Sequence, residues 1–257
     1  MNDEINISEV PNTNNLAIRK FGFSCDDRDT TIPLPLPQTL NFCMGLVGKA
    51  GSGKTTLLLN LVCKNKTKKS SGIYNKKFDK IFVFSPSLLT MKNNPFESIP
   101  EEQIYEEGLT AENLEEVLDE IKESDEKVLL IIDDCVNDIT KSTELQRLLC
   151  KTLMNRRHLA GADGGVSIIL TSQVYNKLPC PVRKCFSHLF LMNSKQRREL
   201  DSLYDEHILI SKPNFYKVLK HTFKEKRDFL YLDLQAPYDQ MFHRNFNKLT
   251  INFKEDD

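Results

Sequence analysis

Residues 46–58 read LVGKAGSGKTTLL, and this stretch decides the fold. Positions 48–55 match the phosphate-binding pattern G-x-x-x-x-G-K-[ST], with a further glycine at position 51 that eases a tight loop. An apolar run at 42–47 precedes the loop, and a longer apolar run at 55–62 follows it. Strand, glycine-rich loop and helix are therefore predicted in the order that a P-loop requires.

The P-loop pattern also predicts which residues hold a nucleotide. Glycines let successive backbone N–H groups converge on the β-phosphate, and the positive end of the helix dipole adds to the attraction. Lys54 is expected to reach the β- and γ-phosphates, and Thr55 is expected to coordinate Mg²⁺. The predicted cofactors are therefore ATP and Mg²⁺. The predicted nucleotide-binding residues are Gly48, Lys49, Ala50, Gly51, Ser52, Gly53, Lys54, Thr55 and Thr56.

Two adjacent carboxylates follow a second apolar run. The run VLLII at 128–132 is typical of a strand buried on both faces of a parallel sheet, and it ends in Asp133 and Asp134. Asp133 is predicted to hold Mg²⁺, usually through water, and Asp134 is predicted to act as the general base that polarises the attacking water. A helix cap or a turn is the alternative role. Capping accounts for one aspartate, but not for both after a fully apolar strand.

Another apolar strand is predicted at 78–84, between the P-loop strand and the strand that ends at Asp133. This order resembles the division of P-loop ATPases that contains an inserted strand, and the guanine-reading motif Asn-Lys-x-Asp does not occur in the sequence. In that division a polar side chain at the end of the next strand senses the γ-phosphate. The resemblance implies this role for Gln173, which follows the run at 166–171.

Ring-forming ATPases complete their site with an arginine from a neighbouring subunit, which stabilises charge on the transferring phosphoryl group. The candidates here are Arg156, Arg157 and Arg183. Arg157 is the preferred one, because it lies at the end of the helix predicted at 142–159, before the sensor strand. A cation at a helix carboxyl end is also favoured by the helix dipole alone, which leaves a structural role open.

The apolar pattern predicts an α/β fold with a mostly parallel central sheet in a single P-loop ATPase domain at 39–235. An arm at 1–38, with one strand at 16–23, precedes this domain, and a tail at 236–257 follows it. Further strands are predicted at 186–192 and 229–234, and helices within 100–124 and at 195–207 and 215–221. The amino terminus lacks a secretory signal pattern and no apolar run approaches the length of a membrane span, so we expect a protein that is neither secreted nor membrane-spanning.

Taken together, the motifs at 46–58, 131–134 and 170–173 resemble those of the genome-packaging ATPases of large DNA viruses and virophages, in the FtsK/HerA superfamily. The resemblance covers about residues 40–195. It implies a three-layer RecA-like core, a homo-oligomeric ring, capsid or portal-like partners, and ATP-driven movement of double-stranded DNA into a preformed capsid. It also implies residence in the host cytoplasm, at the virus factory, or in the virion. The sequence departs from many members of the wider group in having Asp134 where they carry glutamate.

Two other functions fit the same motifs: another DNA-handling ATPase, such as a helicase loader, and a nucleotide-gated switch that hydrolyses ATP slowly. The net charge of −1 excludes binding of nucleic acid by bulk electrostatics, so any DNA contact must be local. The basic stretches at 64–69 and 195–198 are candidates for contact with the DNA backbone. Charge runs of this kind more often mark solvated faces.

Overall fold

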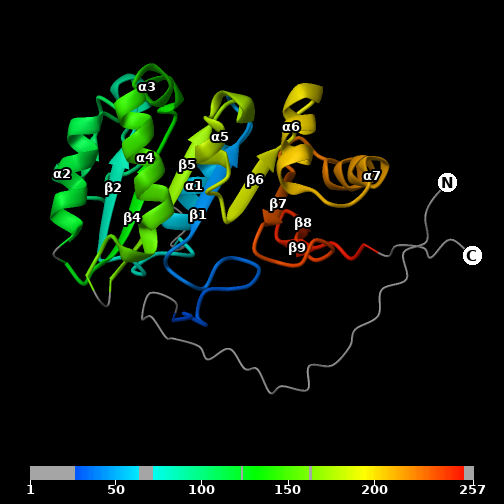
Figure 1. Cartoon of the computed structure of the whole chain (residues 1–257), viewed down its shortest axis with the longest axis horizontal. Coiled ribbons are helices and arrows are strands. Elements are labelled where there is room, and N and C mark those ends of the chain that lie inside the picture. Colours follow the sequence, from blue (N-terminus) through cyan, green and yellow to red (C-terminus); the bar gives the residue numbers. More distant parts are fainter. Residues whose placement is uncertain (1–26, 64–71, 123, 162–163, 252–257) are drawn as a thin grey trace, which may run out of the picture.

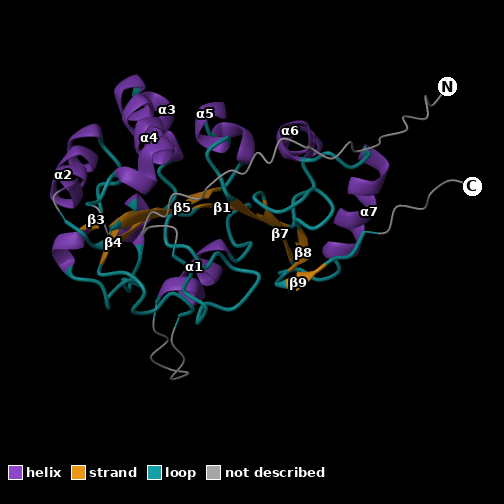
Figure 2. Ribbon diagram, turned by 60° about the horizontal axis from the view of Figure 1, so that its bottom comes forward, coloured by secondary structure: helices purple, strands orange, loops and turns teal. Residues whose placement is uncertain are grey.

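A computed structural model of the chain describes residues 27–63, 72–122, 124–161 and 164–251. These residues form a central sheet with helices on both of its faces (Figures 1 and 2). The strand predicted at 16–23 and the basic stretch predicted at 64–69 lie outside the described residues. Within the described part of the chain, no helix combines the length and the apolarity needed to cross a membrane.

The sheet has nine strands in the order β3-β2-β4-β5-β1-β6-β7-β8-β9. The first six strands in this order are parallel, and β7, β8 and β9 continue the sheet in antiparallel pairing. The arrangement confirms the predicted α/β class with a mostly parallel sheet. The strands are β1 (Cys43–Val47), β2 (Lys80–Phe84), β3 (Ile104–Tyr105), β4 (Lys127–Ile132), β5 (Gly165–Ser172), β6 (His188–Met192), β7 (Phe229–Asp233), β8 (Phe242–Arg244) and β9 (Asn247–Lys248).

The helices are distributed unequally over the two faces of the sheet. Figure 2 shows α1 below the sheet and α2 to α6 above it. The helices are α1 (Lys54–Val62), α2 (Ala111–Lys122), α3 (Val136–Lys141), α4 (Thr143–Asn155), α5 (Cys180–Arg183), α6 (Arg197–His207) and α7 (Lys212–Thr222).

Strand β4 shows why this sequence forms a layered sheet. Successive side chains of a strand point to opposite faces. Accordingly, Leu129 and Ile131 lie in the core beneath the sheet with Leu58 of α1. Leu130 and its neighbours at 128 and 132 lie in the opposite core, with the apolar stripe of α2. Because both faces are covered by helices, every position of this strand after Lys127 is apolar and buried.

The carboxyl-terminal part of the chain differs from the expectation of a tail at 236–257. Strand β8 pairs with β7, with Phe242 opposite Leu232, and β9 pairs with β8. Met241 and Phe242 are buried in the core on the α2 to α6 side. The segment is short and contains no long apolar run, so its strands depend on pairing with β7 rather than on a pattern of their own.

The sheet brings the ends of separate strands together at one edge. Strands β1, β4 and β5 are parallel, and β5 lies between the other two. The P-loop follows β1, Asp133 and Asp134 follow β4, and Gln173 follows β5. This edge, at the carboxyl ends of parallel strands, is where open α/β sheets bind their ligands.

Candidate active site

The P-loop connects β1 to α1 through two residues with left-handed backbone conformations. Gly51 has a φ of 74° and Gly53 a φ of 107°. A side chain at either position would meet open space, so the backbone angle rather than crowding requires glycine there. Gly48 has a different reason, because a Cβ at this position would lie 2.4 Å from the Cβ of Met192. The loop and the end of β6 therefore pack directly against one another.

Lys54 is the first residue of α1, and its side chain is buried against the loop. Its Nζ donates hydrogen bonds to the carbonyl oxygens of Gly48 at 2.5 Å and Lys49 at 3.3 Å. Burial lowers the pKa of Lys54, while the charges of Asp134 and Asp133 act in the opposite direction. The ammonium group is thus held at the mouth of the loop, where it faces two carboxylates.

The amino end of α1 is suited to oxygen atoms of a phosphate. Gly53 provides no side-chain cap, and the first turn contains no acidic residue. The first N–H groups of a helix lack partners within the helix and attract anions. Ser52 Oγ is a buried atom that has no hydrogen-bond partner among the described residues, which is what a group awaiting a phosphate oxygen would show. Thr55 and Thr56 follow in the first turn, with Thr55 half-buried and Thr56 exposed.

Asp133 is fixed by hydroxyl groups from two neighbouring strands. Asp133 is only 4% exposed. Thr171 Oγ1 donates to Oδ1 at 2.7 Å, and Ser85 Oγ donates to Oδ2 at 3.0 Å. Ser87 Oγ lies 3.5 Å from the same Oδ2. Asp133 follows β4, which is separated from the P-loop strand β1 by β5 alone. A carboxylate oriented in this way fits the predicted role of a Mg²⁺ ligand acting through water.

Asp134 adopts a strained conformation for a residue with a side chain, with a φ of 56°. Its backbone N–H donates to Thr171 Oγ1 at 3.0 Å, and its Oδ2 accepts a hydrogen bond from Gln173 Nε2 at 2.8 Å. The predicted base and the predicted sensor therefore touch each other. Thr171 connects both aspartates, since its hydroxyl donates to one and accepts from the other.

Sequence reasoning did not identify Thr171 or Ser85. Thr171 lies near the carboxyl end of β5 and Ser85 directly follows β2, and both hydroxyl side chains are fully buried. That combination is a usable signal, because a buried hydroxyl needs a hydrogen-bond partner.

The structure places Arg156 and Arg157 away from this edge. Arg157 lies in the 3₁₀ turn Arg156–His158 after α4, beyond the amino end of β5 and so at the edge of the sheet opposite the P-loop. Arg156 has a structural role, as its Nε donates to the carbonyl oxygen of Asn41 at 2.6 Å. Arg183 forms an ion pair with Glu206 at 3.0 Å and lies over the ring of Tyr175. The structure does not bring Arg157 to the P-loop of its own chain.

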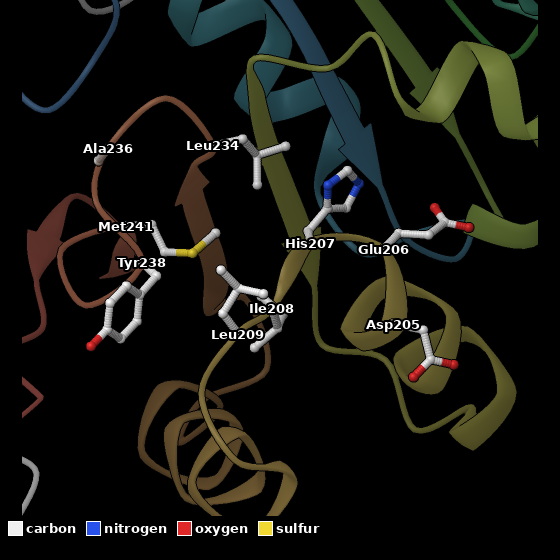
Figure 3. Close-up of a pocket in the computed structure, with 9 residues that line it drawn as sticks. All are labelled: Asp205, Glu206, His207, Ile208, Leu209, Leu234, Ala236, Tyr238 and Met241. Atoms are coloured by element: carbon white, nitrogen blue, oxygen red, sulfur yellow. The ribbon is translucent and has the colours of Figure 1, made fainter. Parts of the chain in front are cut away.

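A separate hollow of about 340 Å³ lies where the end of α6 faces the segment between β7 and β8 (Figure 3). Tyr175, two residues after Gln173, connects to its wall. The Tyr175 hydroxyl donates to Glu206 Oε2 at 2.6 Å and lies 2.8 Å from His207 Nε2. The lining residues of the hollow include none of the predicted nucleotide-binding residues. They are Asp205, Glu206, His207, Ile208, Leu209, Leu234, Ala236, Tyr238 and Met241.

Comparison with known proteins places this site in a family. The pattern of the poxvirus A32 protein family matches residues 37–233. The chain belongs to the poxvirus A32 protein family. The match runs from before β1 to the end of β7, so the whole candidate site lies within the part that the A32 family shares. No curated protein sequence matches the chain.

Solved structures similar to this A32 family member are P-loop ATPases. B204, the DNA-packaging ATPase from Sulfolobus turreted icosahedral virus, is 17% identical over 80% of this chain and 97% of B204, with a TM-score of 0.55. B204 from Sulfolobus turreted icosahedral virus 2, in complex with ATP-gammaS, is 17% identical over 82% of this chain and 99% of that one, with a TM-score of 0.50. The pCW3 conjugation coupling protein TcpA is 12% identical over 84% of this chain and 62% of TcpA, with a TM-score of 0.51. The family match and these folds confirm the predicted resemblance to viral genome-packaging ATPases and the predicted P-loop ATPase fold.

Proposed function

We propose that this A32 family member is an ATP-hydrolysing motor that moves double-stranded viral DNA into a preformed capsid. The observation that carries the proposal is the meeting of Lys54, Asp133, Asp134 and Gln173 at one edge of the sheet, with Gln173 bonded to Asp134. Membership of the A32 family and the fold shared with B204, which is a DNA-packaging ATPase, support the packaging role.

Each residue of the site has a separate role in hydrolysis. The loop at 48–55 binds the phosphates through its backbone N–H groups, and Lys54 neutralises charge on the β- and γ-phosphates. Thr55 and Asp133 would hold Mg²⁺, which when bound supplies further neutralisation of phosphate charge. Asp134 orients and polarises the attacking water, and Gln173, whose amide is bonded to the Asp134 carboxylate, senses the γ-phosphate.

The location of Arg157 fits a site shared between subunits. It lies at the edge of the sheet opposite the P-loop, so a catalytic role for it requires the site of a neighbouring subunit. In a homo-oligomeric ring, each chain would then supply one P-loop and one arginine. The capsid or portal-like proteins would meet this ring at the site of virion assembly in the host cytoplasm or in the virion.

Steady-state ATP hydrolysis tests the proposal, measured with and without double-stranded DNA for the wild type, Asp134→Asn, Arg157→Ala, and a mixture of the two variants. We expect DNA to stimulate the wild type, each variant to be inactive alone, and the mixture to recover part of the activity. Recovery follows because some subunit contacts pair an intact Asp134 with an intact Arg157. Arg147→Ala, on the exposed side of α4, is the matched control and should remain active by itself.

Slow hydrolysis that is insensitive to DNA would contradict the motor and favour a nucleotide-gated switch. DNA stimulation without recovery in the mixture would retain the DNA-handling function but remove Arg157 from the shared site.

A further inference from the structure

The register of the sheet brings exposed lysines and arginines from two separate segments of the chain to one edge. Met192, the last residue of β6, pairs with Phe229, the first residue of β7. Because β6 is parallel to β1 and β7 is antiparallel to β6, the loop that leaves β6 and the loop that enters β7 lie at the same edge of the sheet as the P-loop (Figure 1). We call the exposed cations of these two loops and of the first turn of α6 the basic edge. They are Lys195, Arg197, Arg198, Lys224, Lys226 and Arg227.

Hydrogen bonds to a buried carboxylate fix the conformation of the turn that enters β7. Asp228 is 5% exposed, and its Oδ2 accepts hydrogen bonds from the backbone N–H groups of Lys224 at 3.0 Å and Glu225 at 2.8 Å. The same oxygen accepts from Arg244 at 3.0 Å, and Oδ1 accepts from Asn245 at 3.0 Å. With the backbone turned inward around this carboxylate, the side chains at 224, 226 and 227 are left exposed.

The charges of the basic edge are largely uncompensated within the described residues. Of the six cations, Arg197 forms an ion pair, in which its Nε lies 3.7 Å from Asp201 Oδ2. The Arg197 side chain is nevertheless 85% exposed. Glu199 does not neutralise its neighbours, because it is buried and accepts hydrogen bonds from the Tyr175 N–H and from Ser194. Glu225 is the exposed carboxylate of the turn.

A lysine at the opposite edge of the sheet has its charge compensated. Lys80, at the amino end of β2, forms ion pairs with Glu120 at 3.0 Å and Glu126 at 2.9 Å. Since the chain as a whole has a net charge of −1, the unpaired cations of the basic edge represent a local concentration of positive charge. Local concentrations of this kind are what a polyanion binds.

We propose that the basic edge binds the phosphodiester backbone of double-stranded DNA without reading its sequence. Regularly spaced phosphates fit lysines and arginines that come from two adjacent segments. Neither of the segments 195–198 and 224–227 contains an aromatic side chain on which an unpaired base could stack, which favours a duplex over a single strand. This inference rests on the proposed function and identifies the surface through which that function engages its substrate.

The basic edge is also connected to the ATP site. Asn176 Nδ2 donates to the carbonyl oxygen of Arg198 at 3.2 Å, and the N–H of Tyr175 donates to Glu199 Oε1 at 2.7 Å. Both donors lie within three residues of Gln173, which contacts Asp134. DNA held by the basic edge therefore binds to a segment that is hydrogen-bonded to the continuation of the sensor strand.

The test compares two triple variants of the full chain, each of which loses three positive charges. Lys224→Gln/Lys226→Gln/Arg227→Gln removes half of the basic edge, and Lys141→Gln/Arg147→Gln/Lys151→Gln removes exposed cations of α3 and α4. The probe is a fluorescent DNA duplex of random sequence, and its anisotropy is followed over a range of NaCl concentrations. We expect the first variant to bind roughly tenfold or more weakly and its log–log salt slope to fall by about 2 to 3. The α3–α4 variant should bind as the wild type does.

ATP hydrolysis without DNA should be the same in both variants, while DNA stimulation should be reduced in the first alone. If the first variant has the affinity and salt slope of the wild type, the basic edge is not the DNA-binding surface, while the proposed function still stands. A wild type that neither binds DNA nor responds to it would overturn the proposed function, and the DNA surface with it.

Discussion

Gln173 Nε2 donates a hydrogen bond to Asp134 Oδ2 at 2.8 Å, and this bond joins the ends of β5 and β4. In the proposed mechanism this amide would have two roles. It would orient the carboxylate that polarises water, and it would exchange that carboxylate for an oxygen of the γ-phosphate when ATP is bound. The contact would then report whether a γ-phosphate is present.

Replacing Gln173 should slow hydrolysis more than it weakens ATP binding. We expect Gln173→Ala to lower kcat on the order of a hundredfold, because a positioned donor at the reacting centre is lost. The affinity for ATP, measured by calorimetry, should change little. Gln235→Ala, at an exposed glutamine after β7, is the control. A Gln173→Ala protein with wild-type kcat would show that the contact with Asp134 is only structural.

Removing the Lys54 ammonium should weaken ATP binding itself. A charge-assisted hydrogen bond contributes about 1.5–3 kcal/mol, so Lys54→Ala should bind ATP roughly ten- to a hundredfold more weakly. Lys49→Ala, at an exposed position of the same loop, should have a much smaller effect. The measurement is equilibrium binding of a fluorescent ATP analogue, and unchanged affinity in Lys54→Ala would contradict the P-loop assignment.

The Thr171 hydroxyl should matter for both stability and hydrolysis. Thr171→Val keeps the shape of the side chain but leaves Asp133 Oδ1 and the Asp134 N–H without their shared partner. We expect a loss of about 1–3 kcal/mol in the free energy of unfolding and a strong loss of ATP hydrolysis. Thr171→Ser retains the hydroxyl and should recover most of both properties. Denaturant unfolding and kcat measured on the three proteins would settle the point, and equal behaviour of the Val and Ser variants would refute it.

The buried Asp228 should make stability depend on pH in acid. Burial alone would raise the pKa of Asp228, but hydrogen bonds from Asn245, the backbone of Glu225 and Arg244 outweigh it and lower the pKa from 3.8 to about 2. A carboxyl group whose pKa is lower in the folded state stabilises the fold above its unfolded pKa and loses that contribution as pH falls through the folded value. The wild type should therefore lose stability between about pH 4 and pH 2.

Asp228→Asn should be less stable at neutral pH and should show a shallower loss over this acid range, as followed by thermal unfolding. Glu144→Gln, an exposed carboxyl group on α4, is the control and should retain the wild-type pH dependence. An acid loss in Asp228→Asn as steep as in the wild type would assign the effect to other carboxyl groups.

Much of the candidate site could be predicted because its residues lie in local patterns. The glycines and Lys54 are set by the spacing of the P-loop, and Asp133 follows a run that has to be a buried strand. These features depend on neighbouring positions in the chain. The hydroxyl donors to Asp133 could not be predicted in the same way, since Ser85 and Thr171 reach it from two other strands. Their role exists only once β2, β4 and β5 are side by side.

The sequence by itself determined the parallel α/β class, the phosphate-binding loop and the positions of the carboxylates. The reason is that the periodicity of apolar residues and the residue preferences of a tight loop are both set by a few neighbouring positions in the chain. Tertiary structure decided the left-handed conformation of Asp134, the separation of Arg157 from its own P-loop, and the inclusion of β8 in the sheet. It also assembled the basic edge from residues near 195 and near 225, which lie far apart in the chain. The physical reason is common to all four: each depends on which strands pair and in which direction, and pairing is set by the packing of the whole sheet.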